Sequence, residues 1–326
     1  IEMKNSKRLF ILIEAVLAVM VVILAAVMLR EKNGKALDKV SVIIQNSDDN
    51  QWSAFKYGLR MAAEDQKIEM FVVSTGGGLT AEEAKSMIER EIENGADAVI
   101  VQPVPGADTE RMLRNIEKKI PVMLVGCTAS KEKETSALPT TEPDHYAMGR
   151  ALAEELLKDY NGNINGKTLG ILSETADSEA AVNREKGVRD ALRDTGAVVS
   201  WSVYDSFEET EENLLGAHPR VDIVIALDDN SLTTAGKTAA AKNLHGALVY
   251  GIGNSTEAVY YLDTGFAECL VVPDEFNVGY QSLTEAAESL KHSFPKMQDR
   301  TVSYTVIRRD TLFSKENQEV LFTMSQ

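Results

Sequence analysis

From residue 40 onward, short runs of apolar, mostly β-branched residues alternate with longer amphipathic stretches. The runs show no apolar-polar alternation, which is typical of strands buried on both faces of a parallel sheet. In the stretches between them, such as 80–94 and 177–195, apolar residues recur at every third or fourth position, which indicates helices. The predicted strands are 40–45, 68–73, 96–102, 121–125, 168–173, 197–203, 222–227 and 247–252.

The predicted strands fall into two sets of four, and within each set they begin about 25 to 29 residues apart. Such alternation predicts the α/β class, with helices on both faces of parallel sheets and right-handed crossovers. The repeated plan therefore predicts two doubly wound parallel-sheet lobes. Two later strands, 268–272 and 302–307, flank a predicted helix at 275–290 and are expected to return the chain to one lobe and then the other.

The segment 9–29 reads LFILIEAVLAVMVVILAAVML, with Glu14 as its one charged residue. A helix of this length reaches about 30 Å, the thickness of a bilayer's hydrocarbon core. No Ala-x-Ala step and no lipid-attachment cysteine follows it, so the pattern favours an uncleaved transmembrane signal anchor over a removed signal peptide. The sequence thus predicts a single-pass protein of the cell membrane, with a linker at 30–37 and an extracytoplasmic folded part.

Composition excludes several classes of function. The net charge is −16 and the pI is near 4.8, with the surplus acids scattered, so the surface repels phosphate backbones and nucleic acid is excluded as a partner. Cys127 and Cys269 lie far apart and are expected to be free thiols. The sequence shows no metal-ligand spacing, nucleophile elbow or dinucleotide fingerprint, so no metal, cofactor or catalytic residue is predicted.

Polar side chains gather just after the predicted strands, where open parallel sheets bind their ligands. Carboxylates, amides and hydroxyls beside an aromatic ring suit a polyhydroxylated ligand, because each hydroxyl both donates and accepts and a sugar face stacks on tryptophan. The sequence therefore predicts a sugar cleft at these strand ends. The segments are 46–52, 74–76, 102–103, 126–128, 174–175, 205–206, 228–230 and 253–254.

Five segments together carry a family pattern: VSVIIQNSDDNQW at 40–52, GADAVIVQP at 95–103, NREKG at 183–187, VDIVIALDDN at 221–230 and VYGIG at 249–253. In this order and spacing the chain resembles the type I periplasmic sugar-binding proteins, whose relatives include the ligand domains of lactose-repressor-like regulators. The resemblance covers about residues 38–310. It implies two lobes that close on a ligand by hinge motion, joined by three crossovers.

The resemblance also implies where the lobes begin and end. One lobe is expected to comprise 38–142 with 274–303, and the other 143–273 with 304–326. The crossovers are then expected near residues 142, 273 and 303.

Ligand-binding residues follow from the resemblance by position. Asp49 and Trp52 stand where the family's first loop touches the sugar, Arg184 where an arginine holds hydroxyls in bidentate fashion, and Asp228 where an Asn or Asp is usual. Structural roles stay open for each of them. Asp49 and Asp228 also suit helix N-caps, Trp52 suits core packing, and Arg184 suits a surface ion pair.

Three positions depart from the family pattern. Gly126-Cys127 stands where many members carry Asp-Arg, Gly253 where an Asp is expected, and Pro273 where a hinge Gln is expected. Each lost anchor removes a charge-assisted or amide bond worth roughly 1.5 to 3 kcal/mol. The residues expected to compensate, and therefore added to the predicted ligand site, are Gln102, Asn254 and Asp274.

The sequence thus predicts a monomeric, membrane-tethered receptor for a small polar ligand, a sugar or sugar-like compound, and no enzyme. Its partner is expected to be an ABC permease or a sensor histidine kinase, and the sequence does not separate uptake from sensing. A degenerate receptor or scaffold without sugar binding and an enzyme on the same fold remain alternatives. A transcriptional regulator is disfavoured, because an apolar segment stands where a DNA-binding helix-turn-helix is needed.

Overall fold

The chain divides into two units between residues 38 and 39. The structure is a computed structural model. It describes residues 20, 37–48, 50–76, 78–104, 106, 108–127, 138–205, 207, 215–291 and 297–321. The sheets, their helices and the candidate site all belong to the second unit.

The prediction of a single-pass membrane protein is contradicted. A spanning helix needs about 20 consecutive apolar residues, whereas the longest described helix, α9 (Glu275–Lys291), has 17 residues and carries charged ones. No helix in the described part of the chain is long and apolar enough to cross a bilayer. The segment 9–29, on which the prediction rested, lies outside the described residues apart from Met20.

One lobe is built on a six-stranded sheet in the order β11-β5-β4-β3-β1-β2, in which every pair is parallel. Its strands are β1 (Lys39–Ile43), β2 (Glu69–Val72), β3 (Ala98–Val101), β4 (Val122–Val125), β5 (Thr140–Pro143) and β11 (Arg300–Val302). Its helices are η1 (Asn50–Trp52), α2 (Ser53–Gln66), α3 (Ala81–Glu93), α4 (Thr109–Glu117) and α9.

The other lobe repeats this plan with the order β12-β10-β9-β8-β6-β7. Only β12, which pairs antiparallel with β10, departs from the parallel arrangement among the described strands. Its strands are β6 (Thr168–Ser173), β7 (Val198–Tyr204), β8 (Ile223–Ala226), β9 (Leu248–Ile252), β10 (Cys269–Pro273) and β12 (Tyr304–Arg308). Its helices are α5 (His145–Asp159), α6 (Glu179–Ala191), η2 (Leu215–Ala217), α7 (Asp229–Ala240), α8 (Thr256–Asp263) and α10 (Lys315–Leu321).

The two parallel-sheet lobes and the α/β class are confirmed. The eight predicted strands and 268–272 all appear within two residues of their predicted ends. Two features differ. Strand β5 was not predicted, because its sequence, Thr-Thr-Glu-Pro, offers no apolar run. The predicted strand 302–307 is two strands, since the chain leaves the first sheet after β11 and joins the second at β12.

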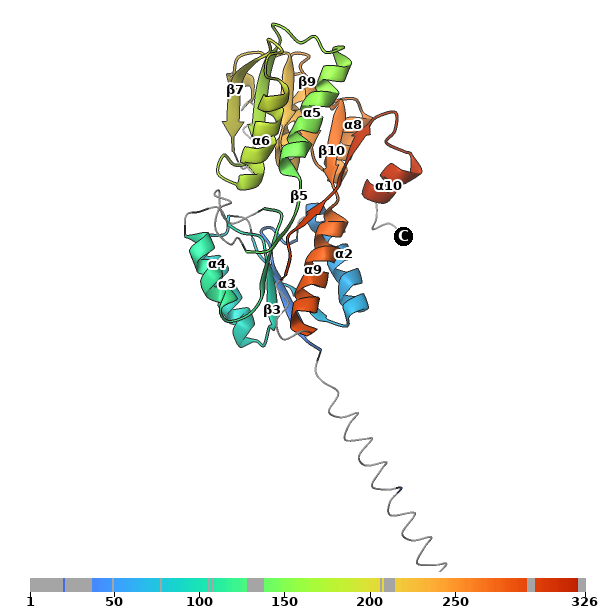
Figure 1. Cartoon of the computed structure of the whole chain (residues 1–326). Helices are drawn as coiled ribbons and strands as arrows, with labels where there is room; N and C mark the ends of the chain where they lie inside the picture. The colour runs from blue at the N-terminus through green and yellow to red at the C-terminus, as the bar shows by residue number, and fades with distance from the viewer. Residues whose placement is uncertain are drawn as a thin grey trace, which may run out of the picture. The chain divides into compact units, whose positions relative to one another are not determined.

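Both faces of each sheet are buried, as the continuous apolar runs predict. Along β1, Val40 and Val42 pack toward α2 and α9, whereas Ile43 packs on the opposite face with residues of α3 and α4. In the second lobe α5 and α6 cover one face, and α7 and α8 cover the other. Figure 1 shows α2 and α9 side by side on the first sheet, and α5 beside α6 on the second.

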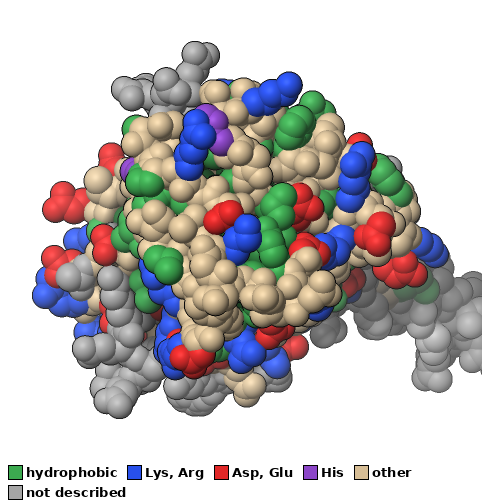
Figure 2. Space-filling model, turned by 90° about the horizontal axis from the view of Figure 1, so that it is seen from above, with side chains coloured by type: hydrophobic (Ala, Val, Ile, Leu, Met, Phe, Trp, Pro, Cys, Tyr) green, Lys and Arg blue, Asp and Glu red, His purple; other side chains and the backbone are tan. Residues whose placement is uncertain are grey.

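Charged side chains are interspersed on the molecular surface. Figure 2 shows acidic and basic side chains mixed across the face seen from above. On α6, Arg189 and Glu185 form an i,i+4 pair with an N–O distance of 2.6 Å. Pairs of this kind contribute only about 0.3 to 0.5 kcal/mol each. Because basic side chains lie among the acidic ones, the acid surplus does not form one continuous patch on the face seen in Figure 2.

In each lobe one pair of helices meets through glycine. A Cβ at Gly58 of α2 would overlap the carbonyl of Phe276 in α9, and a Cβ at Gly279 of α9 would overlap the carbonyl of Phe55. Gly149 of α5 and Gly187 of α6 make the matching contact in the second lobe. Backbones that touch at these points cannot admit a side chain unless the helices separate. The glycines therefore fix how close α2 lies to α9, and α5 to α6.

Gly58→Ala is expected to destabilise the protein by about 1 to 3 kcal/mol, since the added methyl forces α2 away from α9 and this outweighs alanine's better helix propensity. Urea unfolding followed by circular dichroism measures the change. Gly76→Ala is the matched control, because a Cβ there meets nothing within 4 Å. Equal unfolding midpoints for the two variants would contradict the assigned role of the glycine contact.

Candidate functional site

The chain passes between the two sheets at three points, after β5, after β10 and after β11. Asp274 joins two of these crossovers. Its backbone N–H donates to the carbonyl of Ser303 at 3.1 Å, and its carboxylate accepts from the Asn277 backbone N–H at 3.1 Å and side-chain amide at 2.7 Å. Asp274, predicted as a ligand residue, thus caps the start of α9 and ties neighbouring crossovers together.

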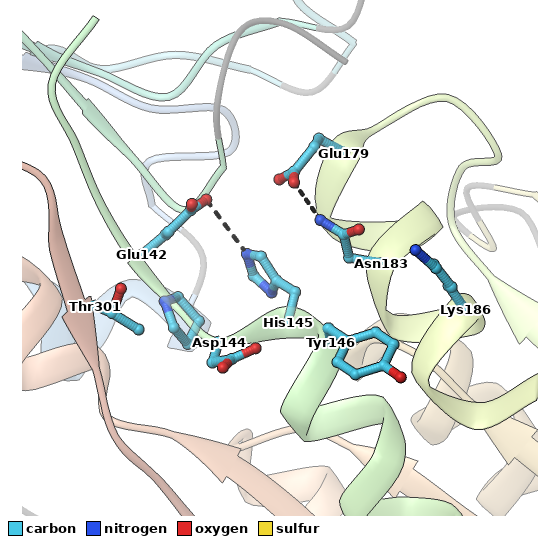
Figure 3. Close-up of a pocket in the computed structure, with 9 residues that line it drawn as sticks. Glu142, Asp144, His145, Tyr146, Glu179, Asn183, Lys186 and Thr301 are labelled. Carbon is cyan, nitrogen blue, oxygen red and sulfur yellow. Dashed lines mark hydrogen bonds and ion pairs between the residues drawn. The ribbon is translucent and has the colours of Figure 1, made fainter. Parts of the chain in front are cut away.

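A cavity of about 370 Å³ lies where the crossover after β5 meets α6. This volume is at the small end of the range for small-molecule sites. Its lining is polar: three acids, Glu142, Asp144 and Glu179, face one lysine, Lys186. Figure 3 shows Glu142 and Glu179 reaching toward the same space from β5 and α6, with His145 between them. The remaining lining residues are Pro143, His145, Tyr146, Asn183 and Thr301.

His145, the first residue of α5, is buried at the base of this cavity, with 4% of its surface exposed. Its Nε2 lies 2.6 Å from the carbonyl oxygen of Gly126, and its Nδ1 lies 3.1 Å from Nε of Arg184. Arginine only donates, so Nδ1 accepts and the proton sits on Nε2, which donates to Gly126. Burial, and then the charge of Arg184, lowers the pKa of His145 to about 3. His145 is therefore a neutral imidazole at pH 7.

Arg184 projects from α6 into a concentration of acidic groups. Its Nη1 donates to the carbonyl of Leu227, just beyond β8, at 2.8 Å. Burial lowers the pKa of Arg184, and the charges of Asp228 and Glu275 oppose that shift. Burial raises the pKa of Glu275 to about 7, although the charge of Arg184 acts in the other direction. The arginine thus lies close to acids from both the second lobe and the crossover before α9.

Cys127 lies in the same region. Burial, reinforced by the charges of Glu142 and Glu179, raises the pKa of its thiol to about 12. Both Cys127 and Cys269 are free thiols. The charge of Arg184 also acts on the pKa of this thiol, in the opposite direction. Charged groups of β5 and α6 thus lie close to the residue that follows β4.

Trp52 and Gln102 converge on Gln45 at the end of β1. Nε1 of Trp52 donates to the Gln45 carbonyl at 2.9 Å, and Oε1 of Gln102 accepts from the Gln45 backbone N–H at 2.8 Å. The Trp52 ring also packs edge-on against Phe55, with centroids 5.4 Å apart. Both predicted ligand residues therefore brace the first loop from within. Asp49, in the same loop, lies outside the described residues.

Asp228 is the N-cap of α7, as the alternative interpretation of the sequence had it. One carboxylate oxygen accepts from the Ser231 backbone N–H at 2.9 Å, and the other accepts from the Glu174 backbone N–H at 2.7 Å. These bonds hold the ends of β6 and β8 together. They also keep a negative charge close to Arg184.

The departure at Gly253 has a structural cause. Asp229 accepts at Oδ1 from the backbone N–H groups of Asn254 at 2.8 Å and Ser255 at 2.9 Å. A Cβ at residue 253 would lie 2.5 Å from that same oxygen. A Cβ at 253 would displace the Asp229 carboxylate from these bonds, which favours glycine there. The same bonds fix the backbone of Asn254, the predicted ligand residue beside it.

The structure thus brings Arg184, Asp228 and the crossover of Asp274 into one region, while Trp52 and Gln102 shape the loop after β1. Sequence analysis missed His145 and the neighbouring Glu142, Glu179 and Glu275 as site residues. Position in the sequence could have indicated Glu142, His145 and Glu275, because one crossover was expected near residue 142 and another near 273.

Comparison with known proteins gives one family match. Residues 40–293 match the family described as "Periplasmic binding protein domain". Comparison with curated protein sequences gives no match.

Many solved structures share the fold. A carbohydrate transporter solute binding protein from Agrobacterium radiobacter, in complex with D-arabinose, is 18% identical with a TM-score of 0.76, covering 88% of this chain and 100% of its own. An ABC transporter solute binding protein from Bacillus halodurans with bound myo-inositol is 18% identical with a TM-score of 0.74 and the same coverage. GanP, a glucose-galactose binding protein from Geobacillus stearothermophilus, is 18% identical with a TM-score of 0.72, covering 86% and 100%. At this identity the likeness shows the fold.

Glu275→Gln is expected to change how stability depends on pH. The pKa of Glu275 is raised from 4.5 to about 7, so the native state holds a proton that the unfolded chain releases. The stability contributed by this proton is present below pH 4.5 and is lost as pH rises through 7, by up to about 1.4 kcal/mol per pH unit. Glutamine mimics the neutral acid, so the variant should gain stability relative to wild type as pH rises.

Urea unfolding between about pH 5 and about pH 8 measures this difference. Glu316→Gln, at an exposed position of α10, is the control and should follow the wild type at every pH. A constant difference between Glu275→Gln and wild type across this range would show that Glu275 is not held protonated.

Proposed function

The chain belongs to the periplasmic binding protein domain family, and we propose that it is a solute receptor that takes up a small polar ligand, a sugar or polyol, between its two sheets. The proposed partner is an ABC permease. D-arabinose, myo-inositol and glucose or galactose are the ligands named for proteins of the same fold, two of which are described as ABC or carbohydrate transporter components. The proposed role is binding and release, without catalysis.

The observation that carries the proposal is the cavity between the crossover after β5 and α6, which is lined by His145, the hydrogen-bond partner of the half-buried Arg184. A ligand there would meet donors and acceptors from both lobes, as hydroxyl groups require. Lobes joined by short crossovers can move relative to each other with little change inside either sheet, and a ligand held by both would favour closure.

We assign the central ligand contact to Arg184. Within the described residues its Nη2 donates no hydrogen bond, so that edge of the guanidinium is open to hydroxyl oxygens. Asp228, Asn254 and Asp274 are proposed contacts around it, although much of their hydrogen-bonding capacity is used internally. Trp52, Gln102 and Asp49 are proposed to act through the first loop.

Ligand binding is expected to raise the melting temperature of the protein. A panel of D-arabinose, D-tagatose, D-glucose, D-galactose and myo-inositol should contain at least one compound that stabilises it. A ligand at 100 times its dissociation constant adds about 2.7 kcal/mol, which moves the midpoint by a few degrees. Differential scanning fluorimetry screens the panel, and calorimetric titration gives the affinity of each compound that shifts the midpoint.

Arg184→Gln should weaken that affinity by about 10- to 150-fold, the equivalent of one charge-assisted hydrogen bond. Arg193→Gln is the matched control, since Arg193 is exposed just after α6 and pairs with Asp190. The proposal fails if no compound shifts the midpoint, or if the two arginine variants bind equally well.

A further inference from the structure

The contact between α5 and α6 is closest beside His145 and Arg184. A Cβ at Gly149, one turn beyond His145, would overlap the carbonyl oxygen of Arg184 itself. A Cβ at Gly187 would overlap the carbonyl of Tyr146, the residue after His145. The two helix backbones therefore touch at Arg184 itself and next to His145, which fixes how far apart the backbones that carry the imidazole and the guanidinium lie.

The same imidazole reaches the first lobe. Gly126 follows β4 and has a φ of 79°, in the left-handed region that glycine adopts without strain. Its carbonyl oxygen accepts from Nε2 of His145 at 2.6 Å. Glycine at 126, where it departs from the family pattern, suits the left-handed φ at which this carbonyl accepts from the histidine. These contacts form a continuous chain of hydrogen bonds, or relay, from the Gly126 carbonyl through His145 and Arg184 to the Leu227 carbonyl.

We propose that His145 is the positioning residue for Arg184, and that its neutral Nδ1, by accepting from Nε, holds the guanidinium with Nη2 turned toward the ligand. This inference rests on the proposed function. Two hydrogen bonds that the guanidinium donates to acceptors on other elements, His145 Nδ1 and the Leu227 carbonyl, define the plane of this planar group. Arg184 then meets a ligand in one orientation, so binding does not have to order a flexible side chain.

The charges around His145 agree with this role. Arg184 faces it from α6, and Oε2 of Glu142 in β5 lies 3.9 Å from Nε2. A protonated imidazole would turn an N–H toward Nε of Arg184, donor against donor, and the relay would break. Burial and the arginine charge keep the ring neutral, which leaves Nδ1 free to accept.

Two substitutions separate the two bonds of His145. In His145→Asn the amide oxygen can occupy the position of Nδ1 and accept from Arg184, but the side chain is too short to reach Gly126. In His145→Gln the amide nitrogen can occupy the position of Nε2 and donate to Gly126, but no acceptor faces Arg184. The control is His218→Gln, because His218 packs on Trp201, with centroids 5.3 Å apart, outside this relay.

Calorimetric titration uses the compound of the arabinose, tagatose, glucose, galactose and inositol panel that most raises the wild-type melting temperature. His145→Asn should keep its affinity within about 3-fold of wild type, whereas His145→Gln should lose about 10-fold or more. On an Arg184→Gln background, His145→Gln should cause no further loss, because the two residues act as one unit. Equal losses in both histidine variants, the reverse order, or additive losses in the double variant would overturn the proposal.

A measurement on the unsubstituted, ligand-free protein keeps the inference testable by itself. At pH 7 the ¹⁵N shifts of His145 should report a neutral ring protonated at Nε2, and the Nε–H resonance of Arg184 should exchange slowly. A ring protonated at Nδ1, or a rapidly exchanging arginine proton, would overturn the positioning role even if a sugar binds. If no panel compound binds, the proposed function fails, and these resonances alone decide whether His145 positions Arg184.

Discussion

The half-buried guanidinium of Arg184 is the group on which the rest of the site depends. A charge removed from water needs hydrogen-bond partners and compensating charge, or it destabilises the fold by several kcal/mol. This chain supplies the Leu227 carbonyl and the neutral Nδ1 of His145 as acceptors. It supplies Asp228 as the main opposing charge, and Glu275 adds to it as the pH rises through about 7. The hydrogen bonds and charges around Arg184 therefore link the second sheet, two crossovers and the end of β4.

The helix contacts make this arrangement rigid. The glycine faces of α5 and α6 bring two backbones together beside His145 and Arg184, and the corresponding faces of α2 and α9 do the same in the first lobe. Helices whose backbones touch cannot approach further, so the backbones that carry His145 and Arg184 keep a fixed spacing. Movement in the protein is therefore expected at the crossovers, where Asp274 and Ser303 join through hydrogen bonds and not through a buried core.

Most of the fold was predictable from sequence, because strands buried on both faces leave continuous apolar runs and amphipathic helices leave a three-to-four repeat. Strand β5 was not, since Thr140–Pro143 has no apolar run, although it pairs with both β4 and β11. The site was predicted less well for a different reason. Asp228 and Trp52 carry hydrogen-bonding groups in segments that follow strands, but the sequence does not reveal that their hydrogen bonds are made internally. The role of His145 depends on a backbone carbonyl distant in sequence, for which no local pattern exists.

Two departures from the family pattern prove to be parts of internal networks. Gly126 gives His145 its acceptor, and Gly253 leaves room for the carboxylate of Asp229. Polar anchors that the resemblance assigns to the ligand are thus replaced by bonds within the protein. These bonds shape the loops around Arg184, and the proposed ligand contact is the open edge of the guanidinium itself.

The most direct test of this account is a crystal structure of the protein with a bound sugar or inositol. We predict a ligand oxygen within hydrogen-bond distance of Nη2 of Arg184, with the bonds to His145 and Leu227 unchanged. A ligand bound away from Arg184, or an arginine that has left His145 to reach the ligand, would contradict it.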